Sequence, residues 1–259
     1  HTQPEARIDL IAQAWSVLSG AAEPHQQQAA IAAMDALLVD RETGLIKLLD
    51  PPLQHAQPSA GYIQAYPPGV RENGGQYTHA GIWALMAQAE QARQAPRSET
   101  CTETAGDTVY RYFTGLSPAH RAQHPTHGAV YGLEPYVVAG DVYTHAPYVG
   151  RGGWSWYTGA AAWLHRAAIE SMFGLRQSAR TLSLTPCLPS HWRQAEITLE
   201  REGRVMRFIL IRASASAALE ETAAWQARRV PRPWYRRFLQ DRPDPCPDTP
   251  SVGSVAVAT

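Results

Sequence analysis

The stretch YVGRGGWSWYTGAAAWLHRAAIE, residues 148–170, joins a glycine-rich loop to a helical pattern. The glycines of its first half allow the backbone to approach a ligand closely or to adopt positive φ. From Thr158 the pattern turns helical, so Thr158 and Gly159 lie at a helix start. Free N–H groups and the positive end of the helix dipole favour an anion there. The stretch therefore predicts a helix that begins beside a candidate anion site.

Charged and aromatic side chains accompany the glycines of this loop. Arg151 carries a planar fork of donors that suits phosphate or carboxylate. Trp154, Trp156 and Tyr157 offer flat apolar faces, which sugars and protein cores both use. An alternative stays open at this point: a glycine-rich loop that enters a buried helix, with tryptophans that only pack.

A second polar stretch, GYIQAYPPGVRENGGQYTHAGIW at residues 61–83, also precedes a predicted helix. Many hydrogen-bonding side chains crowd into its second half. No turn needs so many donors and acceptors, whereas a sugar ring with several hydroxyls does. The stretch therefore predicts a carbohydrate-binding loop. Its hydrogen-bonding residues are Arg71, Glu72, Asn73, Gln76 and His79.

The composition argues against several partners. Among the 259 residues, 23 basic and 23 acidic side chains give a formal net charge of zero, so we expect neither nucleic acid nor an anionic membrane as partner. No apolar run reaches the length of a transmembrane helix, no signal peptide is visible, and we expect this region in the cytoplasm. Three widely spaced cysteines form neither a disulfide framework nor a metal motif. The first residue is histidine, which indicates a piece of a longer protein or a processed product.

Apolar periodicity predicts a mainly α-helical chain over residues 1–175. Long polar and aromatic loops between the helices would share one working face of a helical barrel. Residues 117–130 are expected as a loop and residues 131–143 as a helix or mixed segment. The expected helices cover residues 5–18, 25–39, 79–91, 105–116 and 158–173, and the second of these is expected to bury Ala29, Ala30, Ala33, Met34, Leu37 and Leu38.

After Gly174 the pattern changes to the two-residue alternation typical of strands. We interpret residues 176–212 as the start of a C-terminal β domain. We expect this domain to be incomplete, because a lone hairpin is only marginally stable by itself. Residues 213–259, rich in alanine, serine, arginine and proline, are expected to form a disordered tail. The expected strands are residues 180–184, 195–201 and 205–212.

The two quoted stretches, with LEPYVVAGDVY at residues 133–143 between them, resemble glycoside hydrolase family 94, the inverting phosphorylases of β-linked glucosides. The strings GRGGWSWYTGAAAW and PPGVRENGGQYTHAGIW are most similar to the phosphorylase-like C-terminal region of cyclic β-1,2-glucan synthases. The resemblance covers residues 7–199. It implies an (α/α)6 barrel followed by a β-sandwich-like segment, with residues 1–175 as the C-terminal half of the barrel. Attachment of the whole protein to the inner membrane, through segments outside this chain, stays open.

The family mechanism gives roles to individual residues. Phosphate attacks the anomeric carbon directly while one carboxylic acid protonates the leaving oxygen, so the resemblance implies no second carboxylate and no cofactor. By resemblance, Thr158, Gly159 and His79 bind the phosphate co-substrate. The residues expected to contact or border the sugar are Arg71, Glu72, Gln76, Arg151 and Trp154.

The family's general acid is an aspartate in a Trp-Asn-Asp-Gly type motif, which does not occur in residues 1–259. We expect it upstream, so this chain alone is expected to be an inactive part of the barrel. The implied partners are a β-linked glucan or glucoside, phosphate and the upstream half of the same barrel. The resemblance leaves a homodimer open.

Several candidates also have a structural interpretation. His79 taken alone would more often be a buried or helix-start histidine, and Glu72 could be an ordinary charge at a helix N-terminus. We assign structural roles to Glu134, which precedes a proline, and to Asp141, which could pair inside the barrel.

Other titratable and aromatic residues are expected to be structural. Three histidines have helical spacing, but a proline interrupts them and no carboxylate joins them, so we expect no metal site there. Trp15 and Trp163 are expected in the core. The three histidines are His120, His124 and His127.

Two function classes stay open. The first is an enzyme part, in which the whole protein phosphorolyses β-1,2-linked glucans or controls their chain length. The second is a non-catalytic carbohydrate-binding remnant that keeps the sugar and phosphate loops without an acid. A glycosidase with Glu72 or Glu134 as acid is disfavoured by the anion site at Thr158 and Gly159.

Overall fold

The computed structural model describes residues 5–94, 104–156, 158–178, 182–201, 204–212, 225–227 and 257–258. The chain divides into two compact units, His1–Pro189 and Ser190–Thr259. The first unit is helical and carries small antiparallel sheets, whereas strands form the described part of the second. The predicted mainly helical character of the first part is confirmed.

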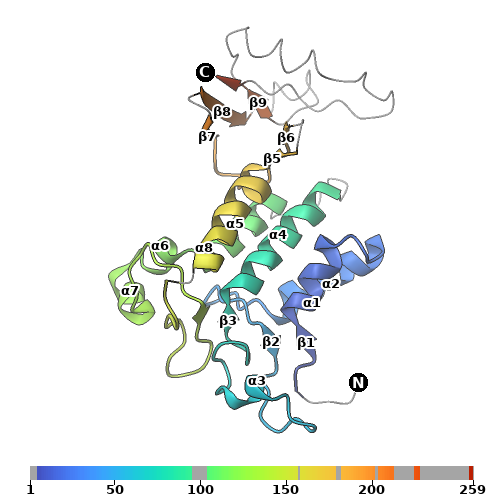
Figure 1. Cartoon of the computed structure of the whole chain (residues 1–259), viewed down its shortest axis with the longest axis vertical. Helices are drawn as coiled ribbons and strands as arrows, with labels where there is room; N and C mark the ends of the chain where they lie inside the picture. Colours follow the sequence, from blue (N-terminus) through green and yellow to red (C-terminus); the bar gives the residue numbers. More distant parts are fainter. Residues whose placement is uncertain are drawn as a thin grey trace. The chain divides into compact units, whose positions relative to one another are not determined.

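The helices of the first unit pack around one central helix, α4 (Figure 1). Their bounds are Leu10–Leu18 for α1, Pro24–Leu37 for α2, Thr78–Gln94 for α4, Ala105–Leu116 for α5 and Thr158–Arg166 for α8, which continues as the π-helix η1 over Ala167–Phe173. α1, α5, α8 and η1 all contact α4, and α2 packs mainly on α1. Small residues permit this crowding: a Cβ on Gly81 of α4 would lie 2.6 Å from Cδ2 of Leu116.

Local signals set the ends of these helices. Asp9 caps α1, since its carboxylate accepts the Ala12 N–H at 3.0 Å. Thr104 and Asp107 form a reciprocal capping box at the start of α5. Gly174 ends η1 with a φ of 82°, where a Cβ would lie 2.0 Å from a carbonyl oxygen. The predicted helix over residues 105–116 is confirmed with the same bounds, and the one over residues 158–173 is confirmed as α8 with η1.

Short strands and helices occupy the segments between the long helices, and β1, β2, β3 and α3 lie toward the end at which α4 begins (Figure 1). All strand pairs are antiparallel: β1 with β2, β3 with β4, and β5 with β6. Their bounds are Ile8–Asp9 for β1, Leu49–Asp50 for β2, Gln76–Tyr77 for β3, Asp141–Val142 for β4, Leu175–Gln177 for β5 and Leu182–Leu184 for β6; α3 covers Tyr62–Ala65, α6 Pro118–Arg121 and α7 Pro125–Tyr131.

Two secondary-structure predictions are wrong. The first helix begins at Leu10 rather than at residue 5, because Ile8 and Asp9 pair with β2. Residues 117–130 are not one loop: α6 and α7 each start with a proline at the first helical position, where its missing N–H is tolerated. Of the two alternatives predicted for residues 131–143, the structure shows the mixed segment: Gly132 ends α7 in the left-handed region, and β4 follows.

Two predictions about the core also need correction. Ala29 and Leu37 of α2 are exposed, and Gln27 is buried in their place, with its side-chain amide donating to the Ala22 carbonyl at 2.8 Å. Trp15 is 40% exposed, although it makes an edge-to-face contact with Trp83 of α4 at 5.6 Å between ring centres.

The second unit is a small antiparallel sheet around β8. Strand β7 pairs with one edge of β8, and β9 and β10 also pair with β8. The predicted strands at residues 195–201 and 205–212 are confirmed as β7 and β8. The predicted tail, residues 213–259, lies outside the described residues apart from β9 and β10, so its disorder stays a prediction. The bounds are Gln194–Arg201 for β7, Arg204–Arg212 for β8, Trp225–Ala227 for β9 and Val257–Ala258 for β10.

Candidate functional site

Three segments meet near the starts of α4 and α8, and the first of them is distant in sequence from the other two. We call them the arginine loop (residues 61–77), the middle segment (residues 140–144) and the glycine-rich loop (residues 148–156). The middle segment pairs with both of the others, through β3 on one side and through a bridge from Val142 to Gly152 on the other. The two stretches singled out in the sequence therefore belong to one surface.

Further backbone hydrogen bonds hold the middle segment between the two loops. The Thr144 N–H donates to the Gly69 carbonyl at 2.9 Å, and the Gly140 N–H donates to the Trp154 carbonyl at 2.5 Å. The Thr78 N–H at the start of α4 donates to the Gly140 carbonyl at 3.0 Å. These bonds fix the loops to the helix end that carries His79.

Asp141 is the buried centre of this arrangement. The residue is only 1% exposed, and its carboxylate accepts the Arg71 N–H at 3.0 Å and the Trp154 N–H at 3.3 Å. Gly153 is required beside it, because a Cβ there would lie 2.2 Å from Oδ1. Burial raises the pKa of Asp141, and the two N–H groups and the Arg71 charge oppose that rise. The structural role expected for Asp141 is confirmed.

Arg71 and Glu72 lie side by side on the arginine loop. Arg71 has a φ of 49°, a strained conformation for a residue with a side chain, and its N–H is the one held by Asp141. Its guanidinium carbon lies 5.3 Å from the ring centres of both Tyr66 and Trp154. Nε of Arg71 lies 3.5 Å from a Glu72 carboxylate oxygen. Both candidates are thus half-buried and held in a defined position.

His79 and Gly159 come together from the first turns of α4 and α8. A Cβ on Gly159 would lie 3.1 Å from Nε2 of His79, so the imidazole faces the bare backbone at the start of α8. The His79 ring stacks on Tyr77, with ring centres 5.8 Å apart, and is tilted against Trp83. Two of the three predicted phosphate ligands are therefore neighbours. The structure describes the backbone of the third, Thr158, as the start of α8.

The electrostatics near His79 favour an anion. Burial lowers the pKa of His79, so its ring is neutral at pH 7. Its Nδ1 is buried and has no hydrogen-bond partner among the residues that the structure describes. The first turns of α4 and α8 supply the positive ends of two helix dipoles. A neutral imidazole and backbone N–H groups can together donate hydrogen bonds to phosphate oxygens.

Gln76 has a different position from the one expected. Its residue is 1% exposed, its side-chain oxygen accepts the Ile46 N–H at 2.9 Å and its amide donates to the Gly115 carbonyl at 3.3 Å. The amide is thus committed to the protein backbone, and a sugar contact by Gln76 does not fit this placement. Asn73, fully buried, likewise bridges Leu53 to the rest of the arginine loop.

Arg151 and Trp154 lie on the glycine-rich loop but point to different neighbours. The guanidinium carbon of Arg151 lies 5.9 Å from the ring centre of Tyr148. Trp154 is 59% exposed and contacts Arg71 across the loops. The structure therefore brings Trp154 to the arginine loop, while Arg151 lies beside Tyr148 at the exposed edge.

The three remaining candidate histidines contact residues outside the three site segments. His124 contacts Thr126 and His127, and His120 contacts Tyr110 on α5. Glu134 is exposed. In the described part of the chain, no three His, Cys, Asp or Glu side chains are grouped so that they could hold a metal ion.

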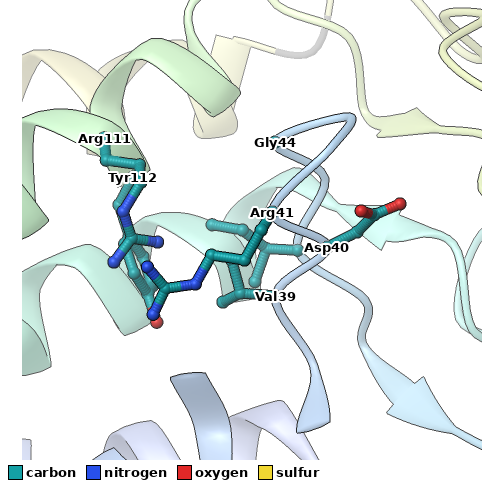
Figure 2. A pocket seen from close by; sticks show the side chains of 7 residues that line it. Val39, Asp40, Arg41, Gly44, Arg111 and Tyr112 are labelled. Atoms are coloured by element: carbon teal, nitrogen blue, oxygen red, sulfur yellow. The ribbon is translucent and has the colours of Figure 1, made fainter. Parts of the chain in front are cut away.

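A small cavity between α5 and the turn after α2 was not foreseen. Figure 2 shows the guanidinium groups of Arg41 and Arg111 converging, while the Asp40 carboxylate points away. Both arginines pair with Asp35 of α2, whose carboxylate also accepts the Tyr112 hydroxyl at 3.2 Å. The volume of about 30 Å³ is sufficient for a water molecule and too small for a sugar. The cavity is therefore not a substrate site.

Comparisons with known proteins place the chain in a family. Residues 1–174 match the catalytic domain of the glycosyl hydrolase 94 superfamily, and the chain belongs to that family. It is 42% identical over 212 residues to the cyclic beta-(1,2)-glucan synthase NdvB of Rhizobium meliloti (strain 1021). The aligned region covers 82% of this chain and 7% of that protein.

Disaccharide phosphorylases are more distant relatives. The chain is 28% identical over 198 residues to solabiose phosphorylase of Paenibacillus borealis, covering 76% of the chain and 24% of the relative. It is also 28% identical over 210 residues to N,N'-diacetylchitobiose phosphorylase of Vibrio furnissii, covering 78% and 23%. The chain thus spans about a quarter of the length of these phosphorylases and a smaller share of the synthase. The family resemblance inferred from the loop motifs is confirmed.

Within the described residues, no helix is both long and apolar enough to cross a lipid bilayer.

Proposed function

We propose that this chain supplies the phosphate-binding and sugar-binding loops of an inverting phosphorylase that acts on β-linked glucans. In the whole protein it would form the C-terminal half of an (α/α)6 barrel, with the general acid on the upstream half. The observation that carries this proposal is the contact between His79 and Gly159, which joins an imidazole to the start of α8. We also propose that this region lies in the cytoplasm, as expected from the sequence.

The residues of this chain have distinct parts in such a reaction. Phosphate would lie against Nε2 of His79 and the N–H groups at Thr158 and Gly159, in line with the anomeric carbon. These neutral donors hold the anion against the positive charge that develops on the sugar ring. Phosphate is itself the nucleophile, so the site needs no carboxylate base. Arg71 and Glu72 would bind sugar hydroxyls beside the phosphate, and Trp154 would stack on a ring.

Calorimetric titration of the chain with inorganic phosphate tests this proposal. His79→Ala removes a side-chain donor, and Gly159→Ala places a methyl group against Nε2, so each variant is expected to weaken phosphate binding by about tenfold. His165→Ala, in the last turn of the same α8, is the matched control and should leave the affinity unchanged. Saturable phosphate binding that survives both substitutions would contradict the proposal.

A second candidate function is carbohydrate binding without phosphorolysis, and the exposure of Trp154 favours it. The same titration separates the two. Binding of a β-1,2-linked glucan without any phosphate binding would support the non-catalytic function. Binding of both ligands, with mutual enhancement, would support a phosphorylase site.

A further inference from the structure

Exposed aromatic residues are concentrated on the site loops. Most large hydrophobic side chains are buried in folded domains, and contiguous exposed groups of them mark binding surfaces. On the arginine loop and the glycine-rich loop, every large hydrophobic side chain that is exposed belongs to tyrosine or tryptophan rather than to an aliphatic residue. They are Tyr62 at 65% exposure, Tyr148 at 53%, Trp154 at 59% and Trp156 at 65%.

Four of the loop side chains form a continuous row. The guanidinium carbon of Arg71 lies 5.3 Å from the ring centre of Trp154 and 5.3 Å from that of Tyr66. The ring centres of Tyr66 and Tyr62 are 6.2 Å apart, and the two ring planes are nearly perpendicular. The row therefore leads from the glycine-rich loop, across Arg71, to α3 at the far end of the arginine loop. We call it the aromatic row: Trp154, Arg71, Tyr66 and Tyr62.

The protein holds both ends of the aromatic row in place. At one end, the Asp141 carboxylate binds the backbone N–H groups of Arg71 and Trp154. At the other end, the side chain of Gln64 in α3 bonds to the Ala60 N–H at 2.9 Å and to the Gln54 carbonyl at 3.1 Å. A surface fixed in this way loses little conformational entropy when a ligand binds.

The chemistry of the aromatic row suits a chain of sugars. Each pyranose ring has an apolar face of C–H groups that stacks on an aromatic ring, and an edge of hydroxyls that bonds to charged groups such as Arg71 and Glu72. Trp154 and Tyr62, the two ends of the aromatic row, are 59% and 65% exposed and therefore leave ring surface on which sugars can stack. A protein partner would be expected to meet aliphatic side chains as well, and an anionic lipid surface would be expected to meet a cluster of lysines.

We propose that the aromatic row forms outer subsites for a β-linked glucan longer than a disaccharide. This inference rests on the proposed function and sharpens its substrate class: an oligosaccharide or polysaccharide whose reacting end lies near His79. Trp154 and Arg71 would bind the sugars next to the reacting bond, and Tyr66 and Tyr62 would bind sugars further along the chain.

The test is titration of the full chain with a β-1,2-linked disaccharide and a β-1,2-linked hexasaccharide. Wild type should bind the hexasaccharide roughly fivefold or more tightly than the disaccharide. Tyr62→Ala should remove most of this preference, while Tyr62→Phe, which keeps the ring, should retain it. The affinity for the disaccharide should be the same in all three proteins, and so should the affinity for phosphate, since Tyr62 lies outside the phosphate site.

Each other result has a defined meaning. Equal affinity for both sugars in wild type, absence of hexasaccharide binding, or an unaltered preference in Tyr62→Ala would overturn the aromatic row as a glucan site. A wild-type dimer that dissociates in Tyr62→Ala, with no sugar effect, would make these rings a protein interface and also overturn it. If hexasaccharide binding depends on Tyr62 while phosphate does not bind, the aromatic row stands and the proposed phosphorylase function fails.

Discussion

The two ends of α4 use their charged and polar groups in opposite ways. At the C-terminal end, Glu90 accepts hydrogen bonds from Arg93 at 2.9 Å and from Arg176 at 2.8 Å, and Arg93 also donates to the carbonyls of Glu170 and Ser171. At the N-terminal end, His79 keeps a buried ring nitrogen without a partner among the described residues. The ion-pair network of Glu90, Arg93 and Arg176 stabilises the fold, whereas the exposed rings of the site loops can bind a ligand. Unpaired buried atoms occur at both ends, since Arg93 Nε and Ser171 Oγ also have no hydrogen-bond partner among the described residues. The site end of α4 therefore differs from the opposite end by its exposed rings and by the bare backbone of Gly159, and not by having more unpaired groups.

The largest expected effect is at Asp141, which holds the site end together. Asp141→Ala leaves the Arg71 and Trp154 N–H groups without their acceptor, so we expect a loss of roughly 3 kcal/mol in the free energy of unfolding. Urea unfolding measures it. Asp141→Asn keeps one acceptor oxygen and should lose less. An unchanged urea midpoint in Asp141→Ala would show that the loops do not depend on this carboxylate.

A smaller effect is expected at the opposite end of α4. Burial tends to raise the pKa of Glu90, but the hydrogen bond and charge of Arg176, with the charge of Arg93, outweigh it and hold the pKa below 4.5. Because the folded state favours the carboxylate, its contribution is present above pH 4.5 and is lost as the pH falls through the folded pKa. Glu90→Gln should cost about 1 kcal/mol at neutral pH, given its partial exposure.

The control for Glu90→Gln lies in the ligand readout. Phosphate affinity should stay at the wild-type value, since the substitution touches only the ion-pair network of Glu90, Arg93 and Arg176. The stability difference from wild type should also shrink below pH 4.5, where Glu90 becomes protonated in both states. A tenfold loss of phosphate binding would contradict the separation of the two helix ends.

The smallest expected effect is a pH dependence at His79. Burial lowers its pKa below 6.5, so the unfolded chain takes up the proton first and stability falls as the pH drops from 6.5 toward the folded pKa. Bound phosphate favours the imidazolium and should reduce this loss. We expect the free energy of unfolding to change by about 1 kcal/mol or less over this pH range. Tm at several pH values, with phosphate or with chloride of equal ionic strength, reports this change. His79→Gln should show no phosphate-dependent change in this slope.

The sequence predicts an element correctly where a local signal determines that element. The capping box at Thr104 and Asp107 and the alternation of residues 205–212 each lie within a few residues of the element that they specify. The loop motifs also predicted that His79 and Gly159 belong to one site, because the family resemblance links them. One proline is misleading in the sequence: Pro125 predicts a break in the helical spacing of the histidines, whereas it occupies the first helical position of α7, which accepts proline.

Long-range partners were beyond reach of a single sequence. Gln76 resembles a ligand-binding amide in its polar loop, but its acceptor and donor, Gly115 and Ile46, lie 39 and 30 residues away. The aromatic row was missed for the same reason, because Tyr62 and Tyr66 gain meaning only when Arg71 and Trp154 lie beside them. Burial of a polar side chain and alignment of aromatic rings depend on tertiary packing, which periodicity does not encode.

The link between Arg71 and Asp141 also has a consequence for the order of folding. Closing the intervening 70 residues costs roughly 4 kcal/mol of chain entropy. The bond from the Thr144 hydroxyl to the Gly74 carbonyl spans the same separation, and the strand pairing of Gln76 with Val142 lies within the same closure. The first contact therefore carries most of the entropic penalty, and the others form with little further cost. The loops should assemble late and in a single cooperative step, and their amides should exchange hydrogen together as one unit.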